Sequence, residues 1–434
     1  MIHLNDQQAL AFIHSRHAVG QKVELRNITH LLERLGNPHK QLKFVHVAGT
    51  NGKGSTSTYT AAALTKAGYH TGLFISPYVI EFRERIQLDG QIIPKEELAQ
   101  VTASVKEAVE SLDALGERCT EFETVTAIAM VWYSRKQADI VVLEVGLGGR
   151  IDPTNVIDRA LVSVITSIGY DHTDVLGDTL GEIAAQKCGI FRPGGRVVAY
   201  PDQDPEAMAV IRKKAKELSC TLTLPDPQAV TLRKMDLFGE EMDYKGLALR
   251  VPLIGKHQIL NCITAVETLF QLRELGFVIP DAAIQDGIAG VRFPARMEIL
   301  CRDPLVILDG AHNPSGLAAL AAALDLVPGQ KVYGVIAMMR DKDCEQALSL
   351  LLPKVSRVMA VSASNPRSHT GESLAAICRR HCGQVDFRES AQEGLKDALA
   401  QLEPGEALVV CGSLYLASDL RPIAKELAEA SKTR

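Results

Sequence analysis

The chain has 434 residues, of which 46% are hydrophobic and 23% are charged, as is usual for a globular protein. This length exceeds one ordinary hydrophobic core and favours two domains. The formal net charge of −5 excludes a general attraction to nucleic acid or to acidic membranes, so we expect neither as a partner. Nine cysteines without a repeating framework, no signal peptide and only short apolar runs predict a cytoplasmic protein with reduced thiols.

The first motif in chain order is a glycine-rich turn after a short apolar run. Two helices are expected within residues 1–40, then a buried strand from Phe44 to Ala48 and a helix from Lys53 to about Ala67. A strand, a glycine loop and a helix N-terminus together turn backbone N–H groups towards a phosphate chain. We therefore predict a phosphate-binding loop in which Lys53 reaches the terminal phosphates and the hydroxyl of Ser55 or Thr56 lies near Mg²⁺. A glycine turn without a ligand is the alternative, because the spacing departs from G-x-x-x-x-G-K-[ST].

Polar residues follow three later strands, expected at 71–75, 140–145 and 161–166. They are Ser76, Glu144 and His172. Ligands of open α/β sheets bind outside the carboxyl ends of the strands, and mixed oxygen and nitrogen ligands suit Mg²⁺ or Mn²⁺. Alternatively, Glu144 pairs with an arginine such as Arg150 and His172 is a surface or capping residue. Lys187 falls beside a predicted helix end, where a lysine is favourable without any ligand.

The second half repeats the alternation of strand and helix. Hairpins are expected within 229–251, a helix over 255–275, and a hinge at residues 292–296. Beyond the hinge the pattern predicts strands at 305–308, 331–337, 357–361, 384–388 and 407–411, with helices at 314–326, 343–351, 372–382, 391–401 and 414–430. The fold class is therefore α/β: an N-terminal P-loop nucleotide-binding domain (1–293) with a mainly parallel sheet, and a smaller C-terminal Rossmann-like domain (294–434). Asp309, His312 and Ser413 follow strands of this second domain, although Ser413 could equally cap the next helix.

Several of these stretches, in this order, resemble the folylpolyglutamate synthase/dihydrofolate synthase family within the Mur-type ATP-dependent amide ligases. The similar segments are 49–55, 76–77, 143–150, 171–173, 187–191, Asn261, 294–296, 309–314 and 411–413. The resemblance implies a ligase in which ATP converts a carboxylate of a pterin substrate to an acyl phosphate, which the amine of L-glutamate attacks. The ATP site would lie in the cleft between the domains.

The resemblance also implies roles for single residues. Phosphate and ATP contacts would come from Thr50, Asn51, Gly52, Lys53, Gly54, Ser55, Asn261, Arg296 and Asp309. The ligands of Mg²⁺, of which we expect two ions with K⁺ as a further candidate, would be Ser76, Glu144, His172 and a carbamylated Lys187. Catalytic roles would fall to Lys53, His172, Lys187 and His312, with His312 and Ser413 near the incoming glutamate.

For the pterin, the similar regions are Val23 to Arg26, Thr120 to Glu123 (with Phe122 and Glu123 as contacts) and Ile151, Asp152 and Pro153. The expected substrates are L-glutamate and tetrahydrofolate or its one-carbon forms, and dihydropteroate stays open because the sequence departs from the family at Glu24 to Asn27. We expect a monomer. The alternatives are a Mur-type ligase acting on another carboxylate, for whose usual N-terminal domain the residues before Gly49 leave no room, and an ATP-binding switch protein.

Overall fold

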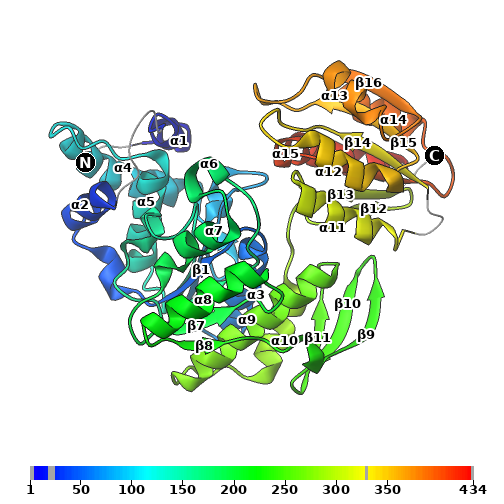
Figure 1. Cartoon of the computed structure of the whole chain (residues 1–434). Coiled ribbons are helices and arrows are strands. Elements are labelled where there is room, and N and C mark those ends of the chain that lie inside the picture. The colour runs from blue at the N-terminus through cyan, green and yellow to red at the C-terminus, as the bar shows by residue number, and fades with distance from the viewer. Residues whose placement is uncertain (1–3, 18–24, 328–330, 432–434) are drawn as a thin grey trace. The chain divides into compact units, whose positions relative to one another are not determined.

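The computed structural model describes residues 4–17, 25–327 and 331–431 (Figure 1). Contacts between Cα atoms divide the chain into two compact units. The first comprises residues 1–231, 242–250 and 258–291, and the second comprises residues 232–241, 251–257 and 292–434. Within the described residues, no helix combines the length and the hydropathy that a membrane crossing requires.

The first unit is built on an eight-stranded sheet with the order β4-β3-β2-β5-β1-β6-β7-β8. From β2 to β8 the neighbouring strands are parallel, whereas β3 and β4 add an antiparallel edge. The strands are β1 Phe44–Ala48, β2 Thr71–Phe74, β3 Ile86–Leu88, β4 Gln91–Ile92, β5 Ile140–Glu144, β6 Val162–Ile165, β7 Arg196–Ala199 and β8 Thr221–Thr223. Every residue of β1, β5 and β6 is buried, which explains why these strands read as continuous apolar runs.

Helices and short 3₁₀ turns connect these strands and cover the sheet. The helices are α1 Asp6–His14, α2 Arg26–Arg34, α3 Lys53–Lys66, α4 Lys95–Asp113, α5 Glu121–Arg135, α6 Thr173–Leu176, α7 Leu180–Lys187, α8 Pro205–Glu217, α9 Lys256–Glu274 and α10 Asp281–Gly290. The turns are η1 Pro38–Gln41, η2 Phe82–Arg85, η3 Pro153–Val156, η4 Cys188–Ile190 and η5 Pro227–Ala229. Capping boxes at Asn5, Thr120 and Thr179 define where α1, α5 and α7 begin.

A separate three-stranded sheet with the order β11-β10-β9 contains β9 Val230–Asp236, β10 Gly239–Tyr244 and β11 Leu247–Val251. The alternating burial of β11 shows one covered face and one open face, as the hairpin pattern of the sequence predicted.

The second unit has a six-stranded sheet with the order β12-β13-β17-β14-β15-β16, parallel apart from the edge strand β12. Its strands are β12 Glu298–Arg302, β13 Leu305–Leu308, β14 Val332–Ile336, β15 Arg357–Ser362, β16 Val385–Ser390 and β17 Ala407–Cys411. The connecting elements are α11 Pro314–Leu324, α12 Cys344–Leu351, η6 Leu352–Lys354, α13 Gly371–Cys378, α14 Ala391–Ala400 and α15 Leu414–Ser431.

The predicted fold class is confirmed. The phosphate-loop strand and helix, the central strands and the second strand–helix series lie within a few residues of the expected positions. The sequence did not predict β3, β4, β12 or α10. β3 and β4 are too short to show a period, and two glycines interrupt the pattern of α10.

Helix α10 packs unusually closely on α3 at Gly287, and this contact gives the first testable prediction. A Cβ atom at Gly287 would lie 2.5 Å from the backbone Cα of Ala63. We expect Gly287→Ala to lower the free energy of unfolding by about 1–3 kcal/mol, because backbone must move to relieve the overlap. The matched control is Gly290→Ala in the same helix, where an added Cβ would meet nothing within 4 Å. Equal stabilities of the two variants in chemical denaturation would contradict the close packing.

Candidate functional site

The phosphate loop lies between β1 and α3, and its backbone is fastened to the end of β6. The N–H groups of Thr50 and Asn51 donate to the carbonyl oxygen of Ser167 at 2.8 and 3.1 Å. The Thr50 hydroxyl makes contacts of 3.1 Å with both the carbonyl and the N–H of Gly169. The helix N-terminus that follows, from Gly52 to Ser55, presents the first-turn N–H groups that have no acceptor within a helix. The loop is therefore an ordered turn that ends in a helix N-terminus of the kind that can bind an anion.

Two lysines meet at the carbonyl oxygen of Gly49. Lys53 Nζ donates to the carbonyls of Gly49 and Thr50, each at 3.1 Å, and Lys187 Nζ donates to Gly49 at 2.8 Å. Lys187, the last residue of α7, is only 3% exposed. Burial, together with the nearby charge of Lys53, lowers the pKa of Lys187 to about 7, although Asp171 and Asp152 oppose the shift. A lysine with this pKa is neutral in a substantial fraction of molecules near pH 7.

Glu144 and Ser76 lie together at the carboxyl ends of neighbouring strands. Glu144 ends β5, pairs in register with Val47 of β1 and is 2% exposed. The backbone N–H of Ser76 lies 3.4 Å from Glu144 Oε2. A buried carboxylate beside a phosphate loop is the oxygen ligand that a hard divalent cation takes, so these residues fit such an ion.

His172 and Thr56 complete the polar groups near this edge. His172 precedes α6 in a left-handed conformation with φ of 50°, and its side chain is 54% exposed with Nε2 3.9 Å from Asp171 Oδ2. The hydroxyl of Thr56 is buried and has no hydrogen-bond partner among the residues that the structure describes. Over the same residues, no three His, Cys, Asp or Glu side chains converge on one point.

Asn261, in α9, packs directly on the loop. A Cβ atom at Gly52, whose φ is +83°, would lie 2.3 Å from Asn261 Oδ1, so only glycine fits there. The amide of Asn261 also donates to Gln258 Oε1 at 3.3 Å. The structure thus places Asn261 against the loop at Gly52.

Two of the predicted substrate residues bind backbone in this structure. Glu123 accepts the N–H of Thr120 at 2.7 Å as part of the α5 capping box. Asp152 accepts the N–H groups of Leu147 and Thr154 at 2.7 and 3.0 Å. Burial raises the pKa of both carboxyls, and these hydrogen bonds oppose the shift.

The other residues predicted to contact the pterin include the sequence neighbours of Glu123 and Asp152. Phe122 is half-buried, packs against Phe74 with a centroid distance of 5.9 Å, and would clash with a Cβ atom at Gly146. Ile151 is half-buried, and Pro153 begins η3. The predicted contacts at Val23 and Glu24 lie outside the described residues.

In the second unit, Asp309 organises the turn that carries Arg296. Its carboxylate accepts the N–H groups of Met297 and Ala311, each at 2.7 Å, and Ala295 and Met297 both have positive φ. Burial raises the pKa of Asp309, and the charge of Arg296 opposes this shift. The turn at residues 295–297 is therefore held to the loop that follows β13.

His312 and Ser413 follow strands of the same sheet. The Nδ1 atom of His312 lies 2.8 Å from the carbonyl of Gly310, which fixes the ring with Nδ1 as the donor. The hydroxyl of Ser413 is buried and accepts the N–H of Tyr415 at 3.1 Å, as a helix cap does. The capping contact that the sequence left open is present.

The sequence did not single out Thr166 and Ser167, although they end the expected strand at 161–166. A Cβ atom at Gly49 would lie 1.9 Å from the Thr166 hydroxyl, and the Ser167 carbonyl holds the loop. Their position at the carboxyl end of β6 was the signal available in the sequence.

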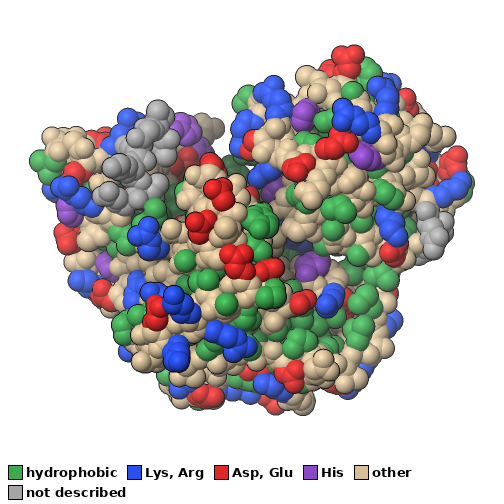
Figure 2. Space-filling view, viewed as in Figure 1, with side chains coloured by type: hydrophobic (Ala, Val, Ile, Leu, Met, Phe, Trp, Pro, Cys, Tyr) green, Lys and Arg blue, Asp and Glu red, His purple; other side chains and the backbone are tan. Residues whose placement is uncertain are grey.

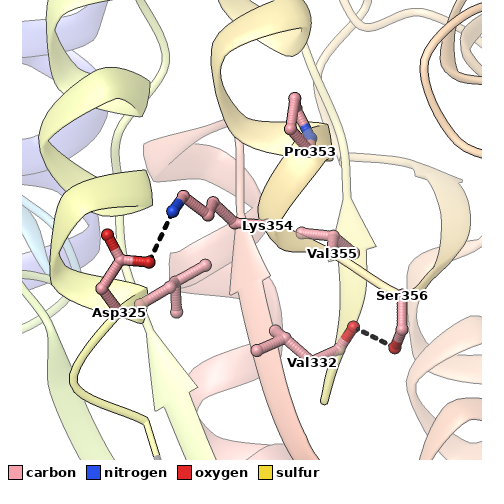
Figure 3. A pocket seen from close by; sticks show the side chains of 7 residues that line it. Asp325, Val332, Pro353, Lys354, Val355 and Ser356 are labelled. Carbon is pink, nitrogen blue, oxygen red and sulfur yellow. Dashed lines mark hydrogen bonds and ion pairs between the residues drawn. The ribbon is translucent and has the colours of Figure 1, made fainter. Parts of the chain in front are cut away.

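A cavity of about 400 Å³ lies elsewhere in the second unit (Figure 3). It is lined at the start of β14 and before β15, where Lys354 pairs with Asp325 at 2.6 Å and Ser356 donates to the Val332 carbonyl at 2.8 Å. Since β13, β14 and β15 point the same way, this cavity is at the amino edge of the sheet, opposite to the edge of Asp309.

The contact between Gly52 and Asn261 gives a prediction about nucleotide binding. We expect Gly52→Ala to weaken ATP binding at least about tenfold, because the methyl group displaces Asn261 and positive φ costs an alanine about 1–2 kcal/mol. Gly68→Ala is the matched control: its φ is +92°, but an added Cβ would meet nothing within 4 Å. Titration calorimetry compares the two variants, and equal losses of affinity would show that backbone strain alone is responsible.

Comparisons with known proteins identify the family. Models of the Mur ligase middle domain and of the Mur ligase glutamate ligase domain match residues 47–269 and 295–414. The chain is 34% identical to the dihydrofolate synthase/folylpolyglutamate synthase of Bacillus subtilis over 425 residues, covering 96% of this chain and 98% of that protein. It spans 50% of a longer relative from Haloferax volcanii, a probable bifunctional folylpolyglutamate synthase/dihydropteroate synthase, at 34% identity over 95% of the chain.

Solved structures give the same result. The folylpolyglutamate synthase of Mycobacterium tuberculosis complexed with ADP has a TM-score of 0.89 and 27% identity, covering 96% of this chain and 98% of that one. A bifunctional folylpolyglutamate synthase/dihydrofolate synthase from Yersinia pestis, complexed with AMPPNP and a manganese ion, has a TM-score of 0.84 and 29% identity, covering 97% and 98%. The chain belongs to the folylpolyglutamate synthase/dihydrofolate synthase family of Mur ligases.

Proposed function

We propose that this protein is an ATP-dependent ligase that adds L-glutamate to folates. The observation that carries the proposal is the convergence of Lys53 and Lys187 on Gly49 of a preformed phosphate loop, with the buried Glu144 on the adjacent strand. Family membership indicates the reaction class, and the phosphate loop would bind ATP, the first substrate.

The reaction has two chemical steps. A carboxylate oxygen of the folate attacks the γ-phosphorus of ATP, which forms an acyl phosphate and releases ADP. The amine of L-glutamate then attacks the acyl carbon, so that an amide bond forms while phosphate and a proton leave. Transfer of this kind needs alignment of the reactants and neutralisation of phosphate charge, which the helix N-terminus and Lys53 can supply.

We propose that the nucleotide carries a divalent cation, since the Yersinia pestis relative was solved in complex with AMPPNP and a manganese ion. We propose Mg²⁺ as the ion, held by Glu144, Ser76 and His172, with a second Mg²⁺ and K⁺ as further expectations. The ion would neutralise charge on the transferred phosphoryl group. Glu144 fits it because its buried carboxylate lies at the edge of the sheet where the loop ends.

We also propose that Lys187 is carbamylated. The neutral amine adds to CO₂, forming an N–C bond and releasing one proton, so that the cation becomes a carboxylate able to bind metal. Burial of Lys187 beside Lys53 favours the neutral amine that this addition requires.

For the second unit, we propose that Arg296 and Asp309 serve ATP and that His312 and Ser413 serve glutamate. The fixed ring of His312 and the ordered turn at 295–297 support these roles because preorganised groups need no rearrangement when a ligand binds.

The proposed partners are small molecules: ATP, L-glutamate and a tetrahydrofolate. Lysines and arginines are interspersed with acidic residues on the face shown in Figure 2, without a continuous basic surface for nucleic acid. A monomer working in the cytoplasm is the proposed state.

The deciding experiment is a coupled phosphate-release assay with ATP, Mg²⁺ and L-glutamate, run in parallel with tetrahydrofolate and with dihydropteroate. We expect phosphate release that requires both glutamate and tetrahydrofolate. Turnover with dihydropteroate as well would add dihydrofolate synthase activity. No turnover with either substrate would contradict the ligase proposal and favour a switch protein that binds ATP.

A substitution of Lys187 tests the carbamate. We expect Lys187→Ala to lower turnover more than about 100-fold and to be partly rescued by formate or acetate, which replace the carbamate oxygens. Rescue by methylamine instead would show that the lysine acts as a cation. Lys66→Ala, an exposed lysine in the last turn of α3, is the control and should keep full activity.

Ser413 allows a second test of the glutamate site. We expect Ser413→Ala to raise the KM for glutamate several-fold while the KM for ATP stays within about twofold, since only glutamate would lose a contact. Equal changes in both constants, accompanied by a lower melting temperature, would assign Ser413 to the cap of α15 alone.

A further inference from the structure

A buried chain of hydrogen bonds joins the strand before the phosphate loop to the loop that follows β5. His46 lies in β1, and its Nε2 atom is 2.9 Å from the hydroxyl of Thr154. That hydroxyl donates to Oδ1 of Asp152 at 2.5 Å. All three side chains are buried, so the chain runs through the interior of the first unit.

The direction of the chain follows from counting protons. Oδ1 of Asp152 faces the N–H and the O–H of Thr154, and Oδ2 faces the N–H of Leu147, so the carboxylate is an acceptor only. Thr154 gives its one hydroxyl proton to Asp152 and must therefore accept from His46. His46 is then the tautomer that carries its proton on Nε2.

His46 is not a proton-transfer group. Burial and the charge of Arg192 lower its pKa to about 3, so the ring is neutral. Its Nδ1 atom is buried and has no hydrogen-bond partner among the described residues. The other residues of β1 are Phe, Val and Ala. The hydrogen bond to Thr154 is therefore the contact that accounts for a polar imidazole in this buried strand.

The chain ends on a loop that connects several parts of the site. Asp152 accepts a hydrogen bond from the N–H of Leu147. Gly149 of the same loop packs against Lys187, since a Cβ atom at Gly149 would lie 2.8 Å from the carbonyl oxygen of Lys187. A second, independent anchor is Arg192, which donates to the side chain of Asn155 at 2.8 Å. Because Arg192 holds the loop separately, loss of the His46 contact should leave the fold intact.

We propose that His46 is a positioning residue for the pterin substrate: through Thr154 it fixes Asp152 and so sets the loop 146–153. The inference rests on the proposed function and on the expectation, taken from the family resemblance, that residues 151–153 contact the pterin. His46 lies in β1 before the loop at residues 49–52 begins, so its contact with Thr154 does not involve the phosphate loop directly.

The experiment measures KM and kcat of the full-length protein with ATP, Mg²⁺, L-glutamate and tetrahydrofolate for His46→Leu, Thr154→Val and the double variant. We expect each single change to raise the KM for tetrahydrofolate about tenfold, as for loss of a buried hydrogen bond, with the KM for ATP within about twofold. The double variant should be no worse than Thr154→Val, since both changes break one chain.

Two variants separate positioning from a merely structural role. His46→Gln places an amide N–H near the former Nε2 and should restore most of the affinity for tetrahydrofolate. His39→Leu is the control: His39 is another buried histidine of the first unit, and its Nδ1 also has no partner among the described residues. It should alter stability without altering the KM for tetrahydrofolate.

Additive effects of the two single changes, or equal increases in the KM for ATP and for tetrahydrofolate, would overturn the inference. If His46→Leu does not fold, Thr154→Val compared with Thr154→Ser still decides, since only serine keeps the hydroxyl. Absence of turnover in the unaltered protein would refute the proposed function instead, so the two failures are distinguishable.

Discussion

The carbonyl group of Gly49 is the point on which the first unit depends. Its oxygen accepts hydrogen bonds from Lys53 within the phosphate loop and from Lys187 at the end of α7. Gly49 itself can have no side chain, because Thr166 of the neighbouring strand occupies the space. One peptide unit thus connects the ends of β1, β6 and α7, and a change at any of them would move the helix N-terminus that we propose binds the nucleotide's phosphates.

Hydrogen bonds to the backbone also order the loops at Asp152 and Asp309. Asp152 and Asp309 each stand after the carboxyl end of a parallel strand, and each carboxylate accepts two backbone N–H groups from nearby turns. Burial raises the pKa of both carboxyls, and the shift is opposed by these N–H groups together with the Thr154 hydroxyl at Asp152 and the charge of Arg296 at Asp309. These acids therefore shape the loops next to which ligands would bind, whatever direct contacts they also make.

The fold was largely predictable because buried parallel strands and their helices leave strong periodic signals, as β1, β5 and α3 show. Edge strands such as β4, with two residues, leave no such signal. For the candidate site, the loop glycines, Lys53 and Glu144 stood out by residue type and position, whereas Lys187 was predicted only through the family resemblance. The backbone contacts of Asp152 could not be predicted, because its partners are N–H groups that only turn geometry brings near, whereas Thr120 and Glu123 have the spacing of a capping box.

The edge strands of the eight-stranded and six-stranded sheets have a consequence for aggregation in concentrated solution. The eight-stranded sheet ends in β4, with two residues, and β8, with three, and one edge of the six-stranded sheet is β16, whose sequence Val-Asp-Phe-Arg-Glu-Ser is mostly charged or polar. Long, flat and apolar edge strands can pair with strands of other molecules, whereas short or charged edge strands disfavour such pairing. The fully buried strands β1, β5 and β17 lie inside these two sheets, where both of their edges are already paired with neighbouring strands.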